Sequence, residues 1–184
     1  MRRLILAVAC LVAMGVSMVS GQDWATSEGS CYKKGDINIG LGIPLYPFGV
    51  YAEGDYGFHD AISGGLGVGF VTSSHSVAHS YNEIPVLARA SFHPFNLAVL
   101  STKIPANIRA TLDPYVGLYV GWRFGWASWN SGYGNLPGSA LPLIGGFDLR
   151  EHIGVRWYPM TNFYLFAEEG MGFGWMNIGA GLKF

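Results

Sequence analysis

Apolar and polar side chains alternate with a period of two along much of this 184-residue chain. The pattern is most regular at the C-terminal end, where Met176, Ile178, Ala180, Leu182 and Phe184 alternate with small or polar residues. Such alternation predicts a strand with one apolar face and one polar face. Comparable patterns predict eight strands, over about 36–45, 50–59, 61–72, 83–93, 112–124, 144–158, 163–172 and 176–184.

The charged residues within these segments fall almost entirely on the polar faces. The exceptions are Glu151 and Glu169; because Glu168 and Glu169 are adjacent, one of them must point outward unless the strand carries a bulge. This segregation is expected when one face contacts lipid and the other lines a polar lumen. The predicted fold is all-β, an eight-stranded antiparallel up-and-down transmembrane β-barrel that follows a signal peptide.

Composition favours a membrane barrel over a soluble domain. Charged residues make up 12% of the chain, against about 25% in an ordinary soluble domain, and aromatic residues make up 15%. After the N-terminal segment, no apolar run has the ~18 residues that indicate a transmembrane helix. The net charge of −1 gives no electrostatic reason to expect nucleic acid binding.

The N-terminal residues have the features of a secretory signal peptide. A short basic stretch precedes an apolar run, small residues follow, and cleavage is predicted after Gly21. A membrane anchor, or lipidation at Cys10, fits this segment less well. Removal of Cys10 leaves Cys31 as the one cysteine, which cannot form an intrachain disulfide. The predicted organisation is a signal peptide over 1–21, a periplasmic segment over 22–35 and the barrel over 36–184.

The chain ends on an aromatic residue inside a predicted strand. Because an open sheet edge is not tolerated in lipid, the last strand of a barrel has to pair with the first. This ending resembles the C-terminal signal of bacterial outer-membrane barrels, in which a terminal Phe is recognised by the barrel-assembly machinery. The resemblance implies a location in the outer membrane and an assembly signal at Phe184, Leu182 and Ile178.

Longer stretches resemble one group of these barrels. Residues 156–159 (RWYP) and 162–168 (NFYLFAE) are similar to the last strands of the small porin-like or OmpA-like eight-stranded barrels that are frequent in Bacteroidota. Residues 84–93 and 112–121 are similar to the central strands of that group. The resemblance covers most of the mature chain and implies contact with outer-membrane lipid and lipopolysaccharide, but no particular activity. The chain departs from the group at Glu169, where an apolar residue is frequent.

Charged residues on the polar faces are predicted to plug the lumen. An eight-stranded barrel is just wide enough for its own side chains to fill it, and charges buried there have to pair. Inward-facing glycines leave some space, so a narrow porin or a small-ligand carrier stays open as the alternative. The expected network comprises Glu53, Asp55, Arg89, Arg123, Arg156 and Glu168.

We predict that the protein is not an enzyme and that it has no catalytic residue, cofactor or metal. The segment 73–80 contains serines together with His75 and His79, and Glu83 follows. Some small barrels modify lipid A with a Ser, a His and an acid, but a polar outer loop explains this segment better. Two histidines without a third ligand are also a weak signal for a metal site.

Two segments between the predicted strands remain. Residues 94–111 lie where a short periplasmic turn is expected, and their sequence leaves a strand extension and a membrane-grazing turn open. Residues 125–142 are predicted to lie outside the cell, as are 46–49, 72–82 and 173–175. Aromatic residues among small polar ones suit recognition. The predicted role is therefore structural or surface-interacting, with possible ligand contacts at Trp126, Trp129 and Tyr133.

Overall fold

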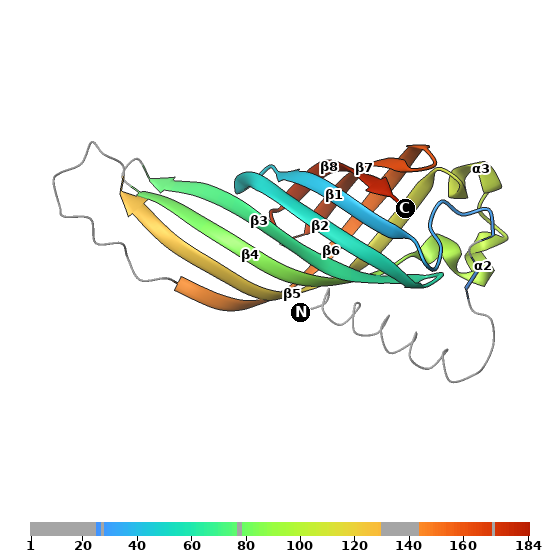
Figure 1. Ribbon diagram of the computed structural model, residues 1–184, viewed down its shortest axis with the longest axis horizontal. Helices are drawn as coiled ribbons and strands as arrows, with labels where there is room; N and C mark the ends of the chain where they lie inside the picture. Colours follow the sequence, from blue (N-terminus) through green and yellow to red (C-terminus); the bar gives the residue numbers. More distant parts are fainter. Residues whose placement is uncertain (1–24, 27, 77–78, 130–143, 171) are drawn as a thin grey trace.

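The computed structural model describes residues 25–26, 28–76, 79–129, 144–170 and 172–184. Its main element is a closed barrel in which each strand pairs antiparallel with the next and the last pairs with the first (Figure 1). This confirms the predicted eight-stranded up-and-down barrel. The strands are β1 (Ile37–Pro44), β2 (Phe48–His59), β3 (Ile62–Ser76), β4 (His79–Phe92), β5 (Leu112–Trp129), β6 (Ile144–Met160), β7 (Phe163–Gly170) and β8 (Met176–Lys183).

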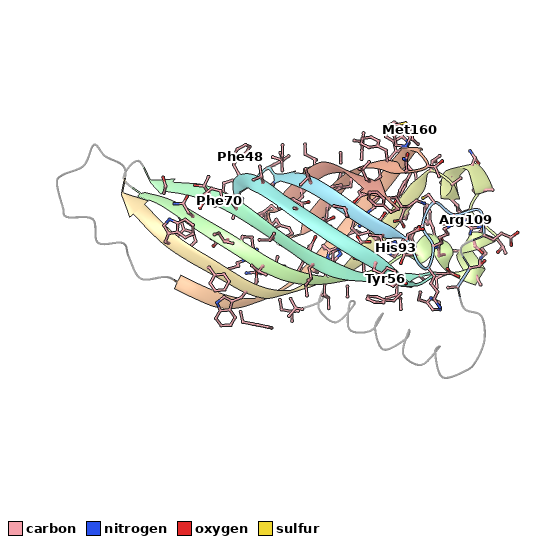
Figure 2. All side chains as sticks on the ribbon, in the orientation of Figure 1. Phe48, Tyr56, Phe70, His93, Arg109 and Met160 are labelled. Carbon is pink, nitrogen blue, oxygen red and sulfur yellow. The ribbon has the colours of Figure 1, made fainter. Side chains whose placement is uncertain are left out.

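Side chains alternate between the outer wall and the lumen along the strands. On β1, Ile39 and Leu41 face outward and are more than half exposed. The neighbouring Asn38 faces the lumen and is 1% exposed. The labelled Phe48 and Phe70 likewise lie on the outer surface (Figure 2). A soluble barrel would place its apolar side chains inside. The apolar outer wall and polar lumen are instead the arrangement of a barrel in lipid.

The misfit at Glu168 and Glu169 is resolved without a bulge. Glu168 is buried in the lumen, and Glu169 is exposed on the outer wall, where it pairs with Met176 of β8. Glu169 therefore occupies the last outward position of β7 before the connection to β8. Glu151 is also exposed on the outer wall, on β6.

The barrel wall is much taller on one side than on the other. The strands β3, β4, β5 and β6 have 15, 14, 18 and 17 residues, whereas β1, β7 and β8 have 8 each. A tilted strand crosses the hydrocarbon core with about 9–11 residues. The upper ends of the four long strands therefore extend beyond the bilayer, and Figure 1 shows this extension at its left side. The strands β3 and β4 exceed the predicted limits because polar residues continue their ladder past the apolar alternation.

The segment 94–111 forms helices instead of a strand extension. Its elements are η1 (Pro94–Asn96), α2 (Ala98–Ser101) and α3 (Ala106–Arg109), with a proline at the start of η1 and another just before α3. Proline suits the first turn of a helix and removes a donor from a strand ladder. In Figure 1 these helices lie at the opposite end of the barrel from the strand extension. No helix in the described part of the chain is long and apolar enough to cross a bilayer.

Candidate functional site

Arg89 occupies the centre of the lumen and pairs with two carboxylates. Its Nη1 lies 2.6 Å from Glu53 Oε2, and its Nη2 lies 3.5 Å from Glu168 Oε2. The Tyr119 hydroxyl lies 3.2 Å from Glu53 Oε2 and 3.0 Å from Glu168 Oε1. All four side chains are almost completely buried. The ion pairs and the hydroxyl offset the large penalty of removing these charges from water.

A second ion pair, between Arg156 and Asp55, lies beside the first cluster. Arg156 Nη2 donates to Asp55 Oδ2, and Asn38 Nδ2 donates to Asp55 Oδ1 at 3.0 Å. The Tyr115 ring adjoins both clusters, because its centroid is 5.2 Å from Arg89 Cζ and 5.0 Å from Arg156 Cζ. Both distances suit cation–π attraction. The two clusters and this ring form a continuous layer, named here the central ion layer.

Arg123 belongs to a separate cluster nearer the end where β3–β6 extend, which the sequence predicts to face outside and which is called here the extracellular end. It pairs with Glu83 at 2.7 Å and with Asp148, and its guanidinium also donates to the carbonyl oxygen of Gly172. Asp148 pairs in addition with Arg150. The structure thus brings five of the six nominated lumen residues together and gives Arg123 different partners.

Aromatic rings occupy the space beside the inward-facing glycines. A Cβ added at Gly154 would lie 2.5 Å from the Tyr115 ring, and one added at Gly67 would lie 2.6 Å from Phe173 Cζ. Real Cβ atoms do not approach other atoms so closely, so glycine is required for the rings to fit. At these positions, the space that the sequence left open is filled by side chains.

Phe173 turns into the lumen at the end of the barrel opposite the short helices. The sequence placed residues 173–175 in a loop on the extracellular side, and within this loop Phe173 is 0% exposed. Its ring stacks on Tyr51 at 4.2 Å between centroids and meets the edge of Tyr119 at 5.6 Å. The β7–β8 connection turns inward because an aromatic ring gains more by packing on other rings than by exposure to water. Glycines on both sides of Phe173 are the one sequence signal for such a turn.

The other end of the barrel, which the sequence predicts to face the periplasm and which is called here the periplasmic end, is covered by residues 28–36, named here the strap. Cys31 and Tyr32 of the strap are buried, and the Tyr32 ring stacks on the His93 imidazole at 3.6 Å with an interplanar angle of 8°. Burial, with the nearby charge of Asp113, raises the pKa of the Cys31 thiol to about 12. Figure 2 shows His93 and Arg109 at this end of the molecule, beside the short helices.

Several elements hold the strap in place. Asn96 Nδ2 donates to the Tyr32 carbonyl oxygen at 2.9 Å, and Lys183 Nζ donates to that of Cys31 at 2.7 Å. Arg109 Nη2 donates to the Glu28 carbonyl oxygen at 2.6 Å, and the Cys31 N–H donates to the Arg109 carbonyl oxygen at 2.8 Å. Sequence reasoning missed this closure because non-strand segments have no periodic pattern to place them.

The remaining nominated residues lie outside the lumen. Trp126 is half-buried on the extended part of β5, with its ring 6.2 Å from that of Phe70. The side chain of Trp129, residue Tyr133 and the side chains of His75 and His79 lie outside the part of the chain that is described. Ile178, Leu182 and Phe184 are all exposed on the outer wall.

Phe184 completes the seam that closes the barrel. The Phe184 N–H donates to the Ile37 carbonyl oxygen at 2.8 Å, and the Ile37 N–H donates to the Phe184 carbonyl oxygen at 3.1 Å. On the same strand, Leu182 pairs with Ile39, and Ile178 pairs with Ile43. The last residues therefore satisfy backbone groups of β1 that lipid could not satisfy.

Described side chains from several strands meet inside the barrel at three levels: the strap, the central ion layer and Phe173 with Arg123. Among these residues, no group of three or more His, Cys, Asp or Glu side chains is placed to hold a metal ion. The arrangement is suited to a rigid, closed wall, since each level joins residues from several strands.

No protein-family model and no curated protein sequence matches this chain. Solved structures do match. The chain is similar to the outer membrane protein OprG from Pseudomonas aeruginosa, with a TM-score of 0.59, 12% identity, and coverage of 85% of this chain and 98% of OprG. It is also similar to the N-terminal β-barrel domain of Pseudomonas aeruginosa OprF, with a TM-score of 0.57, 18% identity, and coverage of 82% and 98%. This chain therefore has the fold of small outer-membrane β-barrels.

Proposed function

We propose that this protein is a non-conducting outer-membrane barrel with a structural or surface-interaction role. The observation that supports this proposal best is the central ion layer, in which fully buried arginines are held by carboxylates from other strands. An ion passing through would have to separate these pairs, and leaving a buried charge without its partner costs about 3–5 kcal/mol. Phe173 and the strap obstruct the lumen on either side of this layer.

Planar-bilayer recording of the refolded protein tests the closed lumen. We expect no discrete current steps from protein whose folding is established by its heat-dependent shift on a denaturing gel. Phe173→Ala should also be silent, because the central ion layer stays intact. Reproducible single-channel steps from the unchanged protein would overturn the proposal and favour the alternative, a narrow porin or small-ligand carrier.

The tall wall supports a role at the cell surface. The extended parts of β3–β6 rise beyond the length needed to span the bilayer, so they offer the extracellular surface on which a ligand would bind. Trp126 lies on this extension, whereas Trp122, also outward-facing, lies lower on β5 and pairs with Phe147. Bacteria expressing Trp126→Ala should bind a matrix-coated surface less well than those expressing Trp122→Ala. Equal binding by the two variants would argue against contacts at this position.

Insertion is proposed to depend on the last strand. The exposed Phe184 ring would be read by the barrel-assembly machinery, and its backbone completes the seam with Ile37. Deletion of Phe184 should lower the amount of heat-modifiable protein in the outer membrane, whereas Phe184→Tyr should not. Outer-membrane lipid and lipopolysaccharide then surround the apolar wall.

We also propose that the resting protein is not an enzyme. The described residues do contain one arrangement of a serine, a histidine and an acid, but the strap covers it. A substrate cannot reach that serine while Tyr32 stays in place.

A further inference from the structure

Ser63, His93 and Asp113 form a hydrogen-bonded chain beneath the strap. The Ser63 hydroxyl lies 3.0 Å from His93 Nε2, and His93 Nδ1 lies 2.8 Å from Asp113 Oδ1. The three residues come from β3, from the position after β4 and from β5, and each is at most 3% exposed. A serine, a histidine and an acid in this order are the parts of a nucleophilic triad, which is recognised by geometry and not by sequence position.

With a carboxylate at Asp113 and a neutral imidazole, the two hydrogen bonds place the His93 proton on Nδ1. An ionised Asp113 can only accept, so His93 donates to it from Nδ1. In the neutral imidazole Nε2 is then the acceptor, and the bond at 3.0 Å runs from the Ser63 hydroxyl to Nε2. Nε2 is thereby placed to take the Ser63 proton, which is the role of the base in an activated nucleophile.

A second serine–histidine pair in the same lumen lacks the acid. Ser91 Oγ lies 3.0 Å from His152 Nε2, but the buried His152 Nδ1 has no hydrogen-bond partner. The Arg89 guanidinium also donates to Ser91 Oγ, at 3.3 Å from Nε and 3.2 Å from Nη2. The Tyr119 ring packs on this imidazole at 4.5 Å between centroids, but no acid holds its Nδ1. Ser91 therefore serves as an internal reference for Ser63.

Tyr32 occupies the space next to the serine and the imidazole. Its ring covers one face of His93, and its hydroxyl donates to the carbonyl oxygen of Ile62, the residue before Ser63, at 2.8 Å. Tyr32 is 0% exposed. Its withdrawal would therefore leave a slot of the size of a phenol ring beside Ser63 and His93.

We propose that Ser63, His93 and Asp113 form a masked acyl-transfer site that accepts aryl-sized carboxylic esters when the strap withdraws Tyr32. Ser63 Oγ bonds to the ester carbonyl carbon while His93 Nε2 takes the hydroxyl proton. Nε2 returns that proton to the departing alcohol oxygen as the ester C–O bond breaks, which leaves an acyl-serine. Water then attacks the acyl carbon, again giving a proton to Nε2, and Ser63 regains it as the carboxylic acid leaves.

In this mechanism Asp113 is a positioning residue that holds the imidazole tautomer. The site goes beyond the role proposed above and does not depend on whether the lumen conducts. It stands at the periplasmic end, so its substrate would arrive from the periplasm. The strap acts as the lid.

Cys31 reports lid opening independently of the chemistry. It is next to Tyr32 in the strap, and in the closed structure Cys31 is 7% exposed and its thiol has a raised pKa. Both properties suppress alkylation, since the thiolate is the reactive form. Reaction of Cys31 with iodoacetamide, located by mass spectrometry, therefore measures how often the strap opens.

The experiment compares refolded wild-type protein with Tyr32→Gly, which empties the slot. Each is treated with iodoacetamide and, separately, with a fluorophosphonate and with p-nitrophenyl acetate. We expect Tyr32→Gly to be labelled at Ser63, and not at Ser91, at least about 100-fold faster than the wild type. Adding His93→Ala or Asp113→Asn should lower the rate of Ser63 labelling roughly 10²–10⁴-fold. Asp113→Glu keeps a carboxylate and should retain part of that rate.

Each outcome bears on the proposal. Cys31 alkylation without Ser63 labelling in folded Tyr32→Gly would overturn it, and so would equal labelling of Ser63 and Ser91. If Cys31 is not alkylated in Tyr32→Gly, the double variant Tyr32→Gly, Arg109→Ala is tested in its place. Arg109 donates to the Glu28 carbonyl oxygen, so its loss should release the strap. Protection in this variant as well would contradict the assignment of the strap as the lid.

Discussion

The two ends of the lumen are closed by different interactions. At the extracellular end, one aromatic ring, Phe173, packs on Tyr51 and Tyr119, and Arg123 holds the adjacent carbonyl. At the periplasmic end, the strap is held by polar side chains from three other parts of the chain. The first closure depends on a fitted cavity between strands. Beside the stacked Tyr32 ring, the second depends on hydrogen bonds that water can replace, so we expect it to open more readily.

The central ion layer lies between the two closures and holds fully buried charges, so the largest effect is expected there. Asp55→Ala would leave the fully buried Arg156 without its carboxylate partner. We expect the free energy of unfolding to fall by about 3–5 kcal/mol, because an uncompensated charge would stay in the lumen. Urea titration in lipid vesicles, read from tryptophan fluorescence, would measure the change.

The outward-facing Glu169→Ala is the matched control for Asp55→Ala. Glu169 is exposed on the outer wall, so its removal should change the free energy of unfolding by no more than about 0.5 kcal/mol. Equal effects of the two substitutions would show that the Arg156–Asp55 pair does not stabilise the lumen.

Phe173→Ala should break the extracellular closure and leave the periplasmic one unchanged. Loss of the buried ring should lower the free energy of unfolding by about 3 kcal/mol, the low end of the range for this change. Phe70→Ala, which truncates an outward ring of β3, is expected to have a smaller effect. The alkylation rate of Cys31 should be the same in both variants, and a faster rate in Phe173→Ala would show that the two closures are coupled.

The outward faces were predictable from the sequence because the lipid-facing side chains repeat with the period of the strand. Periodicity also gave the inward position of Arg123, but not its height in the lumen, which depends on the register between strands. Arg123 therefore has Glu83 and Asp148 as partners, and not the acids of the central ion layer. Phe173 lies in the β7–β8 connection and Tyr32 in the segment before β1, where no period shows that a side chain turns inward.

Gly67→Ala tests how tightly the Phe173 ring packs against β3. The added Cβ would lie 2.6 Å from Phe173 Cζ, so the ring or the strand has to shift. Overpacking of this kind costs about 1–3 kcal/mol, and Phe173→Ala in the same chain should remove that penalty. Gly146→Ala is the control, since a Cβ there meets nothing within 4 Å. Additive effects of Gly67→Ala and Phe173→Ala in urea titrations would contradict the fit of the plug against β3.

Raising the pH should favour opening of the strap. In the closed strap, burial and then the charge of Asp113 raise the pKa of the Cys31 thiol from 9.0 to about 12. The raised pKa stabilises the closed form fully below pH 9, and this contribution is lost by about 1.4 kcal/mol per pH unit between 9 and 12. Cys31 alkylation by iodoacetamide should therefore keep rising about tenfold per pH unit above 9, where a free thiol reaches its plateau. A plateau at pH 9 for Cys31 would mean that its thiol ionises without opening of the strap.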